Sequence, residues 1–237
     1  NTFEFQDLTK IINIAKRKNI LTFLDNTWGT PLYLKPLKIG FDMSFCSATK
    51  YFSGHSDAMG GSLAVNKKVF KKVMFFYKLS GYRLSADEAY LIIRGLRTLD
   101  VRLKQHYENT KIIINFLKKQ KKIKEILYPH IPSSKNYKLW KKYYSGANGL
   151  FSVVIKSKKK SSVVKFVNSL ELFGIGYSWG GFESLVLLQE LRTNTKYTQT
   201  RKYLRFAKDE HIVRFHIGLE DPRDLITDLK KSLRYIK

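Results

Sequence analysis

Cysteine, acidic residues and long apolar runs are all scarce in this sequence. The single cysteine, Cys46, excludes a disulfide within the chain and suits a reducing compartment. The five histidines are scattered without the spacing of metal ligands, so we expect no metal site. The apolar runs are short and broken by charges or glycines, and no secretory signal is visible, so we expect no membrane partner. These absences favour a cytoplasmic protein.

Basic residues are in large excess. The 44 lysines and arginines against 19 acidic residues give a formal net charge of +25. One interpretation is a nucleic-acid-binding chain, because clustered lysines release counterions from phosphates. The other is codon bias, since Lys, Ile, Asn, Phe and Tyr are all abundant and have AT-rich codons. No zinc knuckle, RNP-type aromatic strand or basic zipper accompanies the charge, so we favour codon bias and expect no nucleic acid as a partner.

Short apolar runs alternate with longer helical patterns. The expected strands are residues 20–24, 41–46, 61–65, 123–128, 150–155, 174–177 and 212–217. The expected helices are residues 67–78, a long helix that Ser85 begins and that continues through Leu103 toward Phe116, residues 162–170, and a helix from Pro222 with Asp221 as its N-cap. Alternating strands and helices predict an α/β fold with a parallel sheet covered on both faces.

The amino-acid composition of the chain changes after residues 98–120. Lysines and a Pro/Ser-rich loop follow the long predicted helix there. We therefore expect two domains, the end of a large domain in residues 1–98 and a small C-terminal domain in residues 99–237.

Two charged residues follow apolar strands. Asp25 ends the first predicted strand, and Lys50 lies in the polar turn after the second. Ligands of open α/β sheets bind at the carboxyl ends of strands. A lysine that is partly buried there has a lowered pKa and can form a Schiff base. On these grounds alone, an aspartate that caps a turn is the favoured interpretation of Asp25, and Lys50 could equally be an ordinary surface lysine.

Other polar residues accompany this pair. Ser47 and Thr49 flank Lys50 at alternate positions, and their hydroxyls could bind an anionic group. Farther along, two adjacent glycines, Gly180 and Gly181, would let the backbone approach a ligand closely. Arg214 lies in an apolar strand, where an arginine is costly unless it meets a carboxylate or phosphate.

Three segments resemble the Cys/Met-metabolism family of pyridoxal-phosphate enzymes. The first runs from Asp42 through Ser47-Ala48-Thr49-Lys50-Tyr51-Phe52 to Gly54-His55-Ser56-Asp57-Ala58-Met59 and looks like the cofactor-attachment motif of that family. The second is Arg94-Gly95-Leu96-Arg97-Thr98-Leu99, and the third is His216-Ile217-Gly218-Leu219-Glu220-Asp221. The resemblance extends from about residue 20 to the end of the chain, and its first motif is long and specific.

The resemblance implies a fold, a cofactor and roles. The fold would be that of the type I enzymes of this cofactor, similar to aspartate aminotransferase. Lys50 would bind pyridoxal 5'-phosphate covalently, and Asp25 would keep its ring nitrogen protonated. Ser47 and Thr49 would contact the phosphate, and Ser178 and Arg214 would hold the substrate carboxylate.

Trp179 bears on the reaction. Family members that eliminate at the β-carbon resemble Tyr177-Ser178-Trp179-Gly180-Gly181, whereas members that act at the γ-carbon usually have Ser-Leu-Gly-Gly. The resemblance thus implies β-elimination of L-cystathionine to homocysteine, pyruvate and ammonia in methionine biosynthesis, with Trp179 near the substrate. It also implies a homotetramer with active sites at the dimer interface. The alternatives are a γ-lyase or γ-synthase, or a truncated basic chain without catalysis.

The start of the chain differs from the family. The first residue is Asn1, and no glycine precedes Gly29, whereas family members carry a glycine-containing turn for the phosphate before the residue that corresponds to Asp25. We therefore expect a fragment of a longer polypeptide, which alone binds the cofactor poorly and has little activity.

Overall fold

A computed structural model describes residues 2–189 and 206–237. These residues form two compact units. The three-stranded unit comprises Glu4–Lys104 and Lys135–Asn148, and the five-stranded unit comprises residues 2–3, 105–134, 149–189 and 206–237. No helix among the described residues is long and apolar enough to cross a membrane. The division into residues 1–98 and 99–237 stays a prediction, as does the cytoplasmic location.

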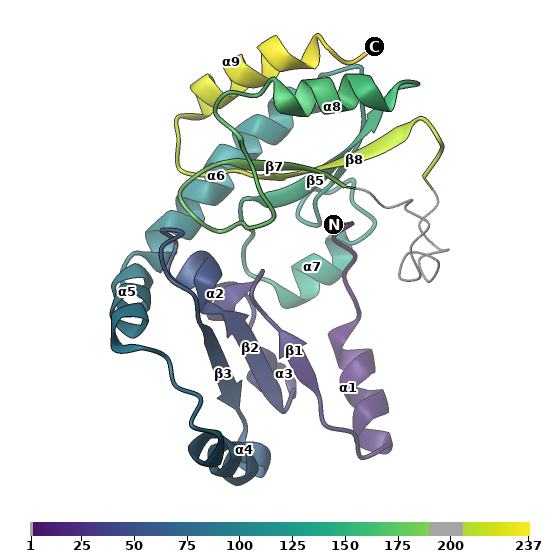
Figure 1. Cartoon of the computed structure of the whole chain (residues 1–237). Coiled ribbons are helices and arrows are strands. Elements are labelled where there is room, and N and C mark those ends of the chain that lie inside the picture. The colour runs from purple at the N-terminus through teal and green to yellow at the C-terminus, as the bar shows by residue number, and fades with distance from the viewer. Residues whose placement is uncertain (1, 190–205) are drawn as a thin grey trace. The chain divides into compact units, whose positions relative to one another are not determined.

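The three-stranded unit is built on the sheet β1-β2-β3 (Figure 1). Its strands are β1 (Phe23–Asp25), β2 (Met43–Ser47) and β3 (Gly61–Val65). Its helices are α1 (Leu8–Arg17), α2 (Thr30–Tyr33), α3 (Pro36–Ile39), α4 (Lys67–Ser80), α5 (Ala86–Leu96) and α7 (Tyr137–Tyr143), with the π-helical turn η1 (Ala48–Phe52) after β2. A core cluster of Leu8, Ile12, Leu34 and Phe41 joins α1 to the segments beside β1 and β2.

The five-stranded unit has the strand order β4-β5-β8-β7-β6. Its strands are β4 (Ile123–Leu127), β5 (Leu150–Lys156), β6 (Gly174–Ile175), β7 (Leu185–Gln189) and β8 (Glu210–His216). The helices α8 (Lys160–Asn168) and α9 (Pro222–Leu233) pack together on one face of this sheet (Figure 1). Helix α6 (Leu99–Leu117) carries the chain from the three-stranded unit into this one.

The strand directions correct one prediction. Among the strand pairs of the described residues, β1–β2 and β6–β7 are parallel, whereas β2–β3, β4–β5, β5–β8 and β7–β8 are antiparallel. The expected parallel sheet is therefore wrong for most strand pairs. An apolar run reports that a strand is buried, but it carries no information on the direction of its neighbours.

Helix ends follow local chemistry closely. The Ser85 hydroxyl accepts the Glu88 amide (3.2 Å), and the Asp221 carboxylate accepts the Arg223 amide (2.8 Å), so both predicted N-caps are confirmed. The prediction of one continuous helix after Ser85 is wrong, because the helix is interrupted between α5 and α6. The Thr98 hydroxyl donates to the Gly95 carbonyl there (3.2 Å) and competes with the regular helical pattern.

Candidate active site

The ends of two parallel strands bring the predicted cofactor residues together. Strands β1 and β2 pair in parallel, with Asp25 opposite Phe45, so both strands end at the same edge of the sheet. Asp25 is the last residue of β1, and Ser47 is the last residue of β2, directly before the turn that carries Lys50. The structure thus gathers Asp25, Ser47, Thr49 and Lys50 at one sheet edge, as expected for an α/β ligand site.

Thr27 connects the two strand ends. Its amide and hydroxyl both donate to Oδ1 of Asp25, at 2.9 and 2.5 Å. The same hydroxyl accepts the amide of Ser47 at 2.8 Å. Sequence reasoning missed Thr27, although a threonine two residues after an aspartate is a common turn pattern that could have drawn attention to it.

Lys50 lies in an irregular turn. Inside η1 its backbone departs from helical geometry, with φ −92° and ψ −122°. Lys50 is half-buried, while its neighbours Tyr51 and Phe52 are fully or almost fully buried. The buried rings anchor the turn, so they fix the backbone from which the lysine side chain projects.

Helix α5 and Arg102 also contact this turn. A Cβ on Gly95 would lie 2.2 Å from the Ser53 carbonyl oxygen and 2.3 Å from that of Phe52, so only glycine permits this contact. Gly95 therefore packs closely against this turn. Arg102, which is 6% exposed, donates to the carbonyls of Gly95 (2.8 Å) and Phe52 (3.4 Å). Burial lowers the pKa of the Arg102 guanidinium. Sequence reasoning also missed Arg102 as a residue of this site.

The two predicted phosphate hydroxyls differ in their contacts. The Thr49 hydroxyl accepts the Gly60 amide at 3.0 Å, and its own proton makes only a 3.4 Å contact with the Gly60 carbonyl. No hydrogen bond to the Ser47 hydroxyl occurs within the part of the chain that the structure describes. Both hydroxyls could therefore still donate to an anion.

Arg214 organises a second group of residues, within the five-stranded unit. It lies in β8, and its Nη2 donates to the carbonyls of Gly176 (3.1 Å), Tyr177 (2.7 Å) and Ser178 (3.3 Å). Burial lowers the pKa of this guanidinium, which is 9% exposed. Among the described residues no hydrogen bond reaches Nε or Nη1, so these donors could serve a carboxylate.

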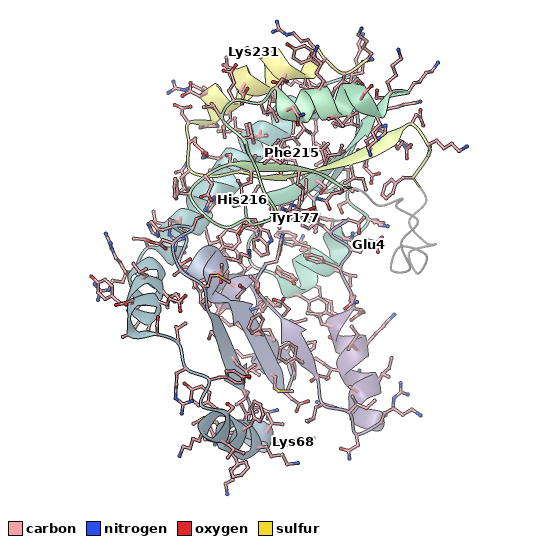
Figure 2. All side chains as sticks on the ribbon, viewed as in Figure 1. Glu4, Lys68, Tyr177, Phe215, His216 and Lys231 are labelled. Carbon is pink, nitrogen blue, oxygen red and sulfur yellow. The ribbon has the colours of Figure 1, made fainter. Side chains whose placement is uncertain are left out.

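The segment after Ser178 is anchored from the same strand. The Gly180 amide donates to Nε2 of His216 at 3.0 Å, and Gly180 has φ +87°, which favours glycine. Figure 2 labels Tyr177, Phe215 and His216 from these two segments, and Phe215 is fully buried. Gly180 thus shapes the segment that carries Ser178 and Trp179.

The residues at the three-stranded sheet edge fit pyridoxal phosphate by their chemistry. A carboxylate suits the ring nitrogen, an amine suits the aldehyde, and hydroxyls suit the phosphate. Among the described residues, Oδ2 of the exposed Asp25 accepts no hydrogen bond, so it can meet a further donor. Cys46 is not a competing nucleophile, because burial and the Asp25 carboxylate raise the pKa of its thiol to about 12.

The described residues contain no comparable cluster of metal-binding side chains. Within residues 2–189 and 206–237 no group of three or more His, Cys, Asp or Glu side chains could hold a metal ion. The expectation that no metal is needed stays a prediction.

Known proteins resemble the chain over almost its whole length. The family described as Cys/Met metabolism PLP-dependent enzyme matches residues 1–234. The chain is 37% identical to a cystathionine beta-lyase of Bordetella avium and 37% identical to an L-alanine/L-glutamate racemase of Wolbachia pipientis wMel, with 98% of this chain and 57% of each relative covered. The chain therefore spans less than two thirds of these relatives.

A solved structure is similar as well. The crystal structure of cystathionine gamma synthase from Xanthomonas oryzae pv. oryzae with aminoacrylate and cysteine matches with a TM-score of 0.88 and 29% sequence identity. The match covers 99% of this chain and 60% of that one. The family and the α/β fold predicted from the sequence motifs are thereby confirmed, whereas the relatives' names disagree on the reaction.

Proposed function

Because the chain belongs to the Cys/Met metabolism PLP-dependent enzyme family, we propose that it acts in the cleavage of a carbon–sulfur bond by β-elimination, with L-cystathionine as substrate. The observation that carries this proposal is the meeting of Asp25 with the Ser47–Lys50 turn at the ends of two parallel strands. The products would be homocysteine, pyruvate and ammonia.

The chain's own residues would divide the work as follows. Lys50 would hold the cofactor covalently until the substrate's amino group displaces it, and the Nζ amine released in that exchange would take the α-proton of the substrate. Asp25 would accept a hydrogen bond from the protonated ring nitrogen at Oδ2, and the hydroxyls of Ser47 and Thr49 would donate to the phosphate. Pyridoxal phosphate, when bound, supplies the electron sink for the α-carbon.

Arg214 and Ser178 would hold the substrate carboxylate. The proposal rests on the two guanidinium nitrogens, Nε and Nη1, that the carbonyls of residues 176–178 do not use. A planar guanidinium can pair with a carboxylate through two parallel bonds. Trp179 follows Ser178 directly and would lie near the substrate's thioether arm.

Two other reactions are possible on the same scaffold. Elimination at the γ-carbon is the activity of other family members, and the Wolbachia relative is named a racemase. Trp179, in Tyr177-Ser178-Trp179-Gly180-Gly181, favours the β-lyase.

A product assay on the complete protein, as its own gene encodes it, separates the three reactions. We expect pyruvate and homocysteine from L-cystathionine. Release of 2-oxobutyrate would instead support elimination at the γ-carbon. Conversion of L-alanine to D-alanine without pyruvate release would support the racemase.

A further inference from the structure

Thr27 has one hydroxyl that serves two residues of the proposed cofactor site. The residue is buried, with 6% of its surface exposed, so water does not compete readily for this hydroxyl. An amide can only donate and a carboxylate can only accept. The Ser47 amide must therefore donate to the hydroxyl, and the hydroxyl proton must point to Oδ1 of Asp25.

This arrangement determines how Asp25 is presented. The Thr27 amide also donates to Oδ1, so two donors fix one oxygen of the carboxylate and leave Oδ2 to meet the ring nitrogen. The same hydroxyl holds the last residue of β2, three positions before Lys50. A shift of Thr27 would thus move the carboxylate and the start of the lysine turn together.

We propose that Thr27 is a positioning residue, which couples Asp25 to the Ser47–Lys50 turn and so sets the distance between the ring-nitrogen partner and the covalent attachment point. This inference rests on the proposed function, because it assumes that Asp25 and Lys50 bind the same cofactor molecule. It concerns orientation, and no proton is transferred through Thr27.

The chain contains a matched control for this inference. Thr22 precedes β1, and its amide and hydroxyl both donate to Oδ2 of Asp42, at 2.8 and 2.9 Å. Its hydroxyl accepts the Asp42 amide at 2.9 Å. Thr22 thus donates and accepts the same kinds of hydrogen bond as Thr27, except that the carboxylate and the amide both belong to Asp42. It lies at the opposite ends of the same two strands, away from Lys50.

The test uses the complete protein loaded with pyridoxal phosphate and three variants. Thr27→Val keeps the shape and removes the hydroxyl, Thr27→Ser keeps the hydroxyl, and Thr22→Val removes the control hydroxyl. The readouts are the dissociation constant of the cofactor and the protonation of its isotope-labelled ring nitrogen, followed by NMR as the pH is varied. Thermal unfolding of each variant reports structural damage.

We expect Thr27→Val to weaken cofactor binding about tenfold, the effect of one hydrogen bond to a charged group. The ring nitrogen should also lose its proton at lower pH, because a loosely held carboxylate stabilises the cation less. Thr27→Ser should restore both values. Thr22→Val should unfold at lower temperature but keep wild-type cofactor binding and ring protonation.

Three results would overturn the inference. The first is a Thr27→Val protein with wild-type affinity and ring protonation, and the second is a Thr27→Ser protein as impaired as Thr27→Val. The third is a Thr22→Val protein with the same cofactor defects, which would reduce Thr27 to a structural role. These results leave the proposed function intact, whereas failure of the wild-type protein to bind the cofactor would overturn both.

Discussion

At the residue scale, Lys50 distinguishes the proposed chemistry from any binding role of the same fold. Lys50→Ala is expected to abolish turnover and covalent attachment of the cofactor, because no other amine follows β2 in this turn. Borohydride reduction followed by mass spectrometry measures the attachment. Lys67→Ala, which replaces an exposed lysine after β3, should retain it. A Lys50→Ala protein that still carries the reduced cofactor would contradict the assignment.

Arg214 provides a second residue test. Arg214→Lys is expected to raise the Michaelis constant for cystathionine about tenfold or more, because an ammonium cannot pair with a carboxylate as a planar guanidinium does. It also cannot reproduce the three contacts to the carbonyls of residues 176–178. Steady-state kinetics measure the effect, and Arg223→Lys, an exposed arginine on α9, should behave as wild type.

Substrate analogues separate the two functions of Arg214. An analogue without the α-carboxylate should lose little further affinity when Arg214 becomes lysine, because the contact that it lacks is the contact removed. If the analogue loses as much affinity as cystathionine does, then Arg214 only supports the segment that carries Ser178 and does not bind the carboxylate.

At the element scale, the contact between α5 and η1 depends on one missing side chain. Gly95→Ala is expected to lower the free energy of unfolding by about 1–3 kcal/mol, because its Cβ would overlap the carbonyl oxygens of Phe52 and Ser53. Urea unfolding measures this loss. Arg94→Ala, an exposed change on the same helix, should stay within about 0.5 kcal/mol of wild type. Equal stability of the two variants would show that the helix yields without cost.

Elements were predictable where their signals are local. The capping residues Ser85 and Asp221 and the strand β3 occur as the sequence predicts. Helix α7 and strand β7 were missed, and the long helix predicted after Ser85 is interrupted before Leu99. Helix α7 is short and lies where a Pro/Ser-rich loop was expected. Its residue Tyr143 donates to the carboxylate of Asp7, 136 residues away, a contact that no local pattern shows.

At the scale of the whole molecule, the chain exposes much apolar surface around α4. Phe75, Phe76, Leu79 and Tyr82 are between 63% and 76% exposed. Such surfaces commonly mark contacts with other polypeptide. The homotetramer implied by the family resemblance stays a prediction, which light scattering of the complete protein would check.

The sequence by itself determined the family, the strand ends that carry Asp25 and Lys50, and the helix caps. These features depend on residue types within a few positions of one another. Only the tertiary structure decided the strand directions, the bridge from Thr27 to Ser47, 20 residues away, and the contact of Arg214 with Gly176, 38 residues away. Hydrogen bonds between distant residues exist only after the sheets have formed, so no local pattern encodes them.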